Sequence, residues 1–197
     1  MNREDVIKEF EAAGAILKGH FILSSGLHSD TYLQCARVLM DPRRADKLCA
    51  ALAAQLNAKF GIGAFDLVVS PAMGGVIVGY EMGRQLGIPS VFVERVEGSL
   101  ALRRGFEIPE GTRVLVVEDV VTTGKSSKET FACIAEHGGK VLAEASLVDR
   151  TDGEADLGVP LIALLGLKVQ AYEADKLPEH LQSIPAVKPG SRWLKAA

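Results

Sequence analysis

The sequence predicts one α/β domain in which helices cover both faces of a mainly parallel sheet. Its 197 residues suit a single domain with a sizeable core. From about residue 62 to 168, runs of apolar residues alternate with segments that have helical features. Near-continuous apolar strands are typical of strands buried on both faces, and their alternation with helices is typical of parallel sheets.

The composition narrows the class of protein. The formal net charge is −3 and hydrophobic residues make up 48% of the chain, which argues against disorder and leaves no basic surface for nucleic acid. The three cysteines lack the spacing of a zinc ribbon or a disulfide framework. The N-terminus has no secretory signal, and no apolar run is long enough to span a membrane. We therefore expect a cytoplasmic, soluble protein that binds neither nucleic acid nor membrane.

Residues 1 to about 40 predict a small N-terminal hood ahead of the core. Apolar residues at helical spacing predict a helix over residues 3–13, and Gly14 is suited to end it. The segment GHFILSSGLHSDTYLQ (19–34) combines β-prone residues with a Ser-Ser-Gly turn, which predicts a hairpin. We expect these short elements to lie over one edge of the sheet.

The next helix has signals at both ends and along its buried face. Asp41 suits the N-cap, and Pro42 suits the first helical position. Leucines at four-residue intervals from Leu48 to Leu56 form the apolar stripe that is expected to face the core. Gly61 is expected to end the helix.

Strands and helices then alternate. Helices are expected after the first and third strands, ending at Gly87 and near Gly138, and a polar stretch follows the second strand to about residue 111. The tail from Val169 onward, rich in proline and charge, has no clear assignment. The expected strands are the apolar runs at residues 65–70, 90–94, 113–119, 140–149 and 159–167.

Three loops are expected at the carboxyl edge of the sheet, where open α/β sheets bind ligands: residues 71–75, 95–105 and 118–127. The third, EDVVTTGKSS, is the most informative. It fails the P-loop pattern because Asp119 stands where that pattern needs its first glycine. Its second half still combines hydroxyls, backbone amides and a helix start, all of which favour a phosphate.

The acidic pair in front of this turn needs a different partner, because carboxylates repel phosphate. Sugar hydroxyls donate hydrogen bonds to carboxylates, and a nearby Mg²⁺ can tie sugar oxygens to a diphosphate. Glu118 and Asp119 are therefore expected to hold a ribose whose 5-phosphate lies in the turn. The alternative is an ordinary strand-to-helix turn with a capping threonine.

The segment VLVVEDVVTTG (114–124) resembles the phosphoribosyl diphosphate signature of the type I phosphoribosyltransferases. In that signature, four apolar residues, two acids, two apolar residues and Thr-x-Gly follow one another. The segments at residues 70–87, 21–34 and 188–192 are similar to those of the orotate phosphoribosyltransferase family in its compact bacterial and archaeal forms. The resemblance covers nearly the whole chain.

This resemblance implies a type I phosphoribosyltransferase fold and a homodimer. It also implies an activity: transfer of the 5-phosphoribosyl group from phosphoribosyl diphosphate to orotate, giving orotidine 5′-monophosphate and diphosphate in pyrimidine biosynthesis. The reaction implied is substitution at the ribose C1 carbon, with exclusion of water by a closing lid.

By resemblance, Glu118 and Asp119 hold the ribose hydroxyls. The 5-phosphate is expected to be enclosed by the residues that follow: Val120, Val121, Thr122, Thr123, Gly124, Lys125 and Ser126. Thr122 also approaches orotate, and Arg150 binds the orotate carboxylate. A guanidinium fork matches a carboxylate through two parallel hydrogen bonds, while an ordinary surface charge at a strand end is the alternative for Arg150.

Ala72, Met73 and Gly74 match the loop that binds diphosphate in the family. Glycines let a backbone approach an anion, although small residues also begin helices for packing reasons. Mg²⁺ is the expected cofactor, held mainly through the substrates near Asp119, with no metal ligand directly assigned. We also assign a catalytic role to Asp119.

Residues 95–105 occupy the position of the family's mobile lid. Many relatives carry lysines and a histidine in this loop, some of which reach across the dimer to the diphosphate, and Arg95 matches a family position of the loop. Arg103 and Arg104 are candidate substitutes for missing cations, because Val96 stands where lysine commonly follows and the loop has no histidine. We assign catalytic roles to these three arginines, and a solvated arginine pair is the alternative for the last two.

Ser24 stands where well-known relatives have lysine, so its contact with the ligand stays open. Two other functions were weighed. One is a phosphoribosyltransferase for another base, which Arg150 distinguishes because an uncharged purine needs no cation. The other is a non-catalytic regulator that binds phosphoribosyl diphosphate; the acidic balance of the chain argues against it, and the altered lid leaves it open.

Overall fold

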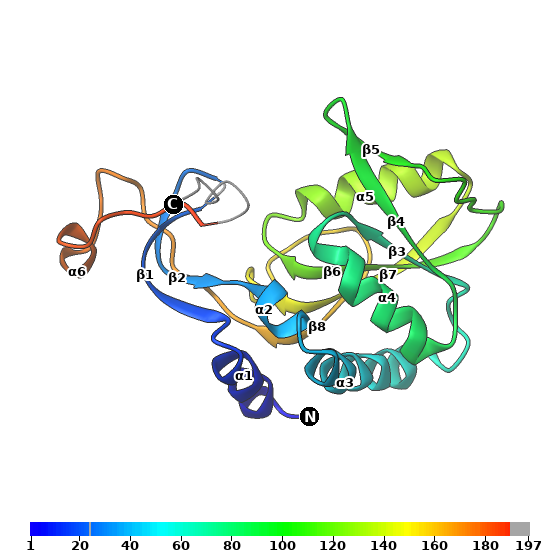
Figure 1. Ribbon diagram of the computed structural model, residues 1–197. Helices are drawn as coiled ribbons and strands as arrows, with labels where there is room; N and C mark the ends of the chain where they lie inside the picture. Colours follow the sequence, from blue (N-terminus) through cyan, green and yellow to red (C-terminus); the bar gives the residue numbers. More distant parts are fainter. Residues whose placement is uncertain (24, 190–197) are drawn as a thin grey trace.

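A six-stranded sheet forms the centre of the domain in the computed structural model, which describes residues 1–23 and 25–189 (Figure 1). Its strands are β3 (Leu67–Pro71), β4 (Ser90–Val96), β5 (Ser99–Leu102), β6 (Arg113–Val121), β7 (Lys140–Asp149) and β8 (Leu161–Gly166). They lie in the order β5-β4-β3-β6-β7-β8, and every neighbouring pair is parallel except β4 with β5. The predicted fold class, a mainly parallel sheet flanked by helices, is confirmed.

Helices cover both faces of this sheet (Figure 1). On one face lie α3 (Pro42–Phe60) and α4 (Gly74–Leu86), and on the other lies α5 (Lys125–Glu136). Successive side chains of β6 serve the two faces in turn: Val117 packs with α3 and α4, and Val116 packs with α5. No helix in the described ranges is long and apolar enough to cross a membrane.

The predicted helix ends are confirmed. The side chain of Asp41 accepts a hydrogen bond from the backbone N–H of Arg43 at 3.0 Å, and Pro42 is the first residue of α3. Gly61 caps the C-terminus of α3, and Gly87 caps α4 with a positive φ of 70°. The three predicted leucines of α3 are fully buried.

The hood combines two helices that share the main core with a hairpin that does not belong to the large sheet. The predicted hairpin is confirmed, as β1 and β2 pair antiparallel in a sheet of their own. Val6, Phe10 and Val38 from the hood helices are buried in the same apolar cluster as α3. The elements are α1 (Arg3–Ala12), β1 (Ile16–Ile22), β2 (His28–Leu33) and α2 (Cys35–Leu39).

The tail from Val169 to Pro189, which the sequence left unassigned, lies along the hairpin of the hood (Figure 1). It contains the short helix α6 (Glu179–Gln182) and forms two bridges to the hairpin, Tyr172 with His28 and Val187 with Phe21. The tail is therefore tied to the hood by backbone hydrogen bonds. Ser24 and residues 190–192, on which parts of the family resemblance rest, lie outside the described residues.

The polar stretch after β4 contains a strand that the sequence did not predict. β5 pairs antiparallel with β4, so that Leu100 lies opposite Arg95 and Leu102 opposite Val93. Its four residues form too short an apolar run to stand out between Gly98 and the arginines that follow. The lid, residues 95–105, is thus largely a hairpin at the edge of the sheet.

Candidate active site

A cleft of about 300 Å³ opens at the carboxyl edge of the sheet. Two of the three predicted loops line it, and the lid does not. The cleft is lined by Tyr32, Leu33, Pro71, Ala72, Gly74, Gly75, Glu118, Asp119, Val120, Thr122, Ser126 and Arg150. Tyr32 and Leu33 were missed by sequence reasoning, because they come from the hood and only the tertiary fold brings them to this edge.

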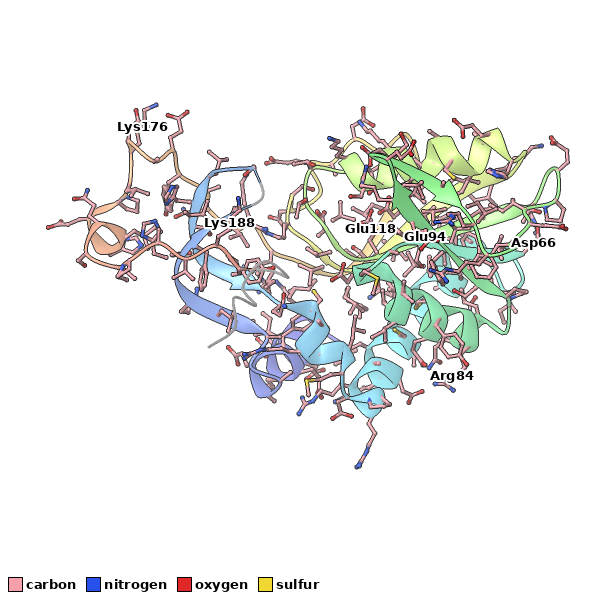
Figure 2. The ribbon with its side chains drawn as sticks, turned by 45° about the horizontal axis from the view of Figure 1, so that its top comes forward. Asp66, Arg84, Glu94, Glu118, Lys176 and Lys188 are labelled. Atoms are coloured by element: carbon pink, nitrogen blue, oxygen red, sulfur yellow. The ribbon has the colours of Figure 1, made fainter. Side chains whose placement is uncertain are left out.

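Glu118 and Asp119 reach the cleft because the buried strand β6 ends there. The preceding residues of β6, Val114 to Val117, are fully buried, and Glu118 itself is only 8% exposed. Figure 2 shows Glu118 inside the body of the domain, whereas Arg84 and Lys176 lie at its outer edge. A rigid buried strand therefore holds the first acid in place.

Burial changes the acidity of both carboxyls. It raises the pKa of Glu118 to about 7; the hydrogen bond from Ser127 opposes this shift, and the charge of Asp119 adds to it. Burial also raises the pKa of Asp119, against hydrogen bonds from the backbone. Such groups gain from donors that approach them, and sugar hydroxyls are donors of this kind.

Gly74 brings the first loop against the second acid. A Cβ atom at Gly74 would lie 2.7 Å from the Oδ1 atom of Asp119, which is too close for any other residue without a shift. The loop at residues 72–75 and the acids at the end of β6 are therefore neighbours, as a single ligand with a ribose and a diphosphate requires.

The phosphate-like turn is built at the start of α5. Gly124 has a φ of 71° and is the N-cap, so the N-cap residue has no side chain to cap the helix, and the first backbone N–H, that of Lys125, makes only a long hydrogen bond of 3.4 Å to the Oγ1 atom of Thr123. A helix start without a side-chain cap leaves backbone N–H groups for an anion. Thr122 and Ser126 line the cleft, whereas Val121 is buried, and Thr123, Gly124 and Lys125 are not among its lining residues.

Arg150 is a half-buried cation without a carboxylate partner among residues 1–23 and 25–189. It lines the cleft, and its Nε atom is buried without a hydrogen-bond acceptor. Burial lowers its pKa, which reflects the cost of removing the charge from water. The neighbouring Asp149 accepts hydrogen bonds from the backbone N–H groups of Thr151 and Gly153 instead. The guanidinium of Arg150 thus lacks an anion.

Each of the lid arginines forms an ion pair with a nearby acidic side chain outside the cleft. Arg95 pairs with Glu129 and donates to the carbonyl oxygen of Gly98. Arg103 and Arg104 lie 3.6 Å and 2.9 Å from the carboxylate of Glu94. None of the three lines the cleft, so their catalytic roles stay predictions.

Met73 also lies away from the cleft. Its side chain is 84% exposed, while its neighbours Ala72 and Gly74 line the cleft. Met73 can contribute its backbone to an anion site, and its side chain faces outward. No group of three or more His, Cys, Asp or Glu residues suited to a metal occurs in the described part of the chain. Two adjacent acids are the donor set at the cleft, which fits an ion held mainly by substrate oxygens.

Comparisons with known proteins agree on one family. Residues 39–157 match the family model of the phosphoribosyl transferase domain. The chain is 57% identical over 194 residues to the orotate phosphoribosyltransferase of Maricaulis maris (strain MCS10), covering 98% of this chain and 100% of the relative. It is also 57% identical to the protein of the same name from Rhizorhabdus wittichii, over 100% of both chains.

A solved structure agrees as well. The crystal structure of orotate phosphoribosyltransferase from Aeropyrum pernix matches this fold with a TM-score of 0.69 and 28% identity. The match covers 83% of this chain and 94% of that one.

Proposed function

Since this chain belongs to the orotate phosphoribosyltransferase family, we propose that its cleft holds phosphoribosyl diphosphate and orotate together during transfer. The chain is a pentosyltransferase that moves the 5-phosphoribosyl group to orotate, in pyrimidine biosynthesis. A phosphoribosyltransferase for another base and a non-catalytic regulator, the two other functions considered, are not supported by these relatives.

The observation that carries the assignment of orotate to this cleft is the unpartnered guanidinium of Arg150. A half-buried cation that lacks an anion is costly, and a carboxylate ligand removes that cost by forming two parallel hydrogen bonds. Orotate carries such a carboxylate. Tyr32 is far from Arg150 in the sequence but lines the same cleft. Its ring gives the flat base an apolar surface to pack against.

Phosphoribosyl diphosphate is expected to lie across the two cleft loops. Its ribose hydroxyls donate to Glu118 and Asp119, and its 5-phosphate accepts hydrogen bonds from the start of α5. Its diphosphate lies against the backbone around Gly74, which approaches Asp119 closely. One ligand then uses both the acidic and the anion-binding half of the site.

The reaction is a substitution at the ribose C1 carbon. A bond forms between C1 and a nitrogen of orotate as the bond from C1 to the diphosphate oxygen breaks. The electron pair leaves with diphosphate, and the proton of that nitrogen is released to water. Positive charge develops on the ribose, close to the carboxylates of Glu118 and Asp119, which stabilise it. The lid arginines are proposed to stabilise the leaving group once they release their acids.

Mg²⁺ is the proposed cofactor, and the donor set of the cleft fits it. The ion would be held mainly by oxygens of the substrate, and Asp119 is the side chain that could contribute to holding it. When bound, it neutralises charge on the leaving diphosphate. The protein itself supplies the alignment of the two substrates and the acids beside the ribose.

We also propose a homodimer in which the lid is shared across the interface. Exposed apolar residues lie at helical spacing at the N-cap of α4 and along its first two turns: Met73, Ile77 and Tyr80, with exposed fractions of 84%, 52% and 71%. Contiguous apolar surface of this kind is typical of protein interfaces. It begins at the diphosphate loop, so a second copy of the chain seated there lies next to the cleft.

A cytoplasmic location is proposed from the thiols. Cys35, Cys49 and Cys133 are all unpaired and buried. Burial raises the pKa of Cys35 and raises that of Cys49 to about 12, so both thiols stay protonated. Free thiols are usual in reducing compartments.

A spectrophotometric assay with Mg²⁺ and phosphoribosyl diphosphate tests the proposed function. Orotate, uracil, adenine and hypoxanthine are offered in parallel. We expect turnover with orotate alone, because orotate is the one base of the four that has a carboxylate for Arg150. Turnover with uracil equal to that with orotate contradicts the role of the carboxylate.

A further inference from the structure

One acid is fully buried inside the sheet. Glu144 stands in the middle of β7 between the buried residues Ala143 and Ala145, and it is 0% exposed. By strand register it lies between Val116 of β6 and Leu161 of β8. A buried carboxyl costs free energy that an apolar side chain at the same place does not. The position therefore calls for an explanation.

Glu144 is linked to the pentose site by one hydroxyl. The Oγ atom of Ser127, on the first turn of α5, lies 2.9 Å from the Oε1 atom of Glu144 and 3.1 Å from the Oε1 atom of Glu118. A serine hydroxyl has a single proton to donate. Two carboxyl oxygens in contact with one hydroxyl therefore need a second proton, which one of the two carboxyls must carry.

The second proton belongs on Glu144. Burial raises its pKa to about 8, and the charges of Glu118 and Asp149 add to the shift, while the hydrogen bond of Ser127 opposes it. No cation among the described residues contributes to stabilising its charged form. Glu118 lines the open cleft, where water or a ligand can stabilise its charge, whereas Glu144 is 0% exposed. Glu144 is thus the better proton holder.

We propose that Glu144 is a positioning residue for the pentose site, acting on Glu118 through Ser127. As a neutral acid it donates to the Oγ atom of Ser127, which donates in turn to the Oε1 atom of Glu118. Glu118 is then held as an acceptor with a fixed orientation toward the cleft. The inference rests on the proposed role of Glu118 in binding ribose.

A set of matched variants tests the chain of hydrogen bonds. Phosphoribosyl diphosphate with Mg²⁺ is titrated calorimetrically into the full chain and into Glu144→Leu, Glu144→Gln, Ser127→Ala and Glu118→Gln. Ser146→Ala is the control, because Ser146 lies on the same face of β7, is also 0% exposed, and has a buried hydroxyl with no hydrogen-bond partner in the part of the chain that the structure describes. The Tm of each variant is recorded.

We expect Glu144→Leu to raise the Kd for phosphoribosyl diphosphate about tenfold, with the KM for orotate unchanged. Glu144→Gln keeps a neutral donor toward Ser127, so its Kd stays within about twofold of the native value. Ser127→Ala should raise the Kd by the same factor as Glu144→Leu. The double variant of Ser127→Ala with Glu144→Leu should bind no more weakly than either single variant, because both changes break the same series of hydrogen bonds. Ser146→Ala should bind as the native protein does.

The pH dependence separates positioning from packing. Ionised Glu144 cannot donate to Ser127, and it places a second negative charge beside Glu118. The ratio of the native Kd to that of Glu144→Gln should therefore rise between about pH 7 and pH 9, through the pKa of Glu144 at about 8. The folded pKa is raised from its ordinary value of 4.5, so the native state binds more protons than the unfolded state between about pH 4.5 and pH 8, and the free energy of unfolding falls over that range. This comparison holds even where Glu144→Leu does not fold.

The outcomes separate a failure of the proposed role of Glu144 from a failure of the proposed function. A native Kd in Glu144→Leu, together with a raised Kd in Glu118→Gln, overturns the role of Glu144 and leaves the proposed function standing. Equal pH profiles of the native protein and Glu144→Gln overturn it as well. A native Kd in Glu118→Gln removes the ribose role of Glu118 itself.

Discussion

The acidic end of β6 and the lid differ in what holds their charged side chains. Glu118 follows four fully buried residues of β6, Val114 to Val117, and its carboxyl is held by the buried hydroxyl of Ser127. Arg103 and Arg104 are held by Glu94 on the surface, with side chains more than half exposed. The acid is thus fixed by the packing of the core, whereas the lid arginines are largely surrounded by water.

This difference has a functional consequence. Exposed ion pairs contribute little to stability, typically about 0 to 1 kcal/mol, so the lid can exchange its present partners for a ligand at small cost. The buried acids have no comparable freedom, which suits groups that must meet a developing charge in a fixed place. We therefore assign substrate binding to the buried acids of β6 and closure of the site to the loosely held lid.

The largest effect is expected from the rigid region. Replacing both acids, in Glu118→Gln with Asp119→Asn, removes two charged acceptors, and the affinity for phosphoribosyl diphosphate should fall roughly a thousandfold. Calorimetry measures this loss. The control pair is Glu154→Gln with Asp156→Asn, two exposed acids outside the cleft. Retained affinity in the first double variant means that the acids do not hold the ribose.

Arg150→Ala is expected to have the next largest effect. The KM for orotate should rise roughly a hundredfold, since the carboxylate of the substrate loses its partner in a partly buried place. The Tm should not fall, because the Arg150 side chain has no ion-pair partner among residues 1–23 and 25–189. Arg113→Ala, which removes a surface ion pair with Asp66, is the control for lost charge. An unchanged KM for orotate removes the assigned role of Arg150.

Disruption of the proposed dimer links the two regions. Ile77→Asp places a charge in the exposed apolar stripe of α4 and should shift the protein to monomers in sedimentation velocity. Turnover should then fall at least about tenfold, because the lid of the partner is lost while binding by the rigid acids remains. Ile62→Asp is the control, since Ile62 is 92% exposed outside this stripe. A monomer with native turnover contradicts a shared lid.

The smallest effect is expected within the lid itself. Replacing Arg103 and Arg104 by alanine should lower kcat about tenfold and leave the Kd for phosphoribosyl diphosphate nearly unchanged. Steady-state kinetics and calorimetry together separate the two quantities. Normal turnover shows that the arginines are a solvated pair and nothing more.

Local signals predicted much of the fold. Asp41 and Pro42 mark a helix start through their own chemistry, and the leucines of α3 mark its buried face through spacing alone. The strand β5 was missed because its four residues give only a weak strand signal. Its pairing with β4 is what makes it a strand, and that pairing is a tertiary contact. The tail was left unassigned for a similar reason, since its order comes from bridges to the hairpin of the hood.

The candidate site was predicted in its central part and missed at its margins. Glu118, Asp119 and the turn after them form one continuous motif, so their grouping is visible in the sequence. Tyr32 lies far from that motif along the chain, and Glu144 is a single acid within an apolar run. Only the register of β6 with β7 brings Glu144 near Glu118, and a linear sequence does not contain that register.

The most direct measurement is a crystal structure of the complex with orotidine 5′-monophosphate. We predict ribose hydroxyls within hydrogen-bonding distance of Glu118 and Asp119, the phosphate at the backbone amides that begin α5, and the base carboxylate on Arg150. A nucleotide bound elsewhere, with the turn at residues 122–126 empty, contradicts the account.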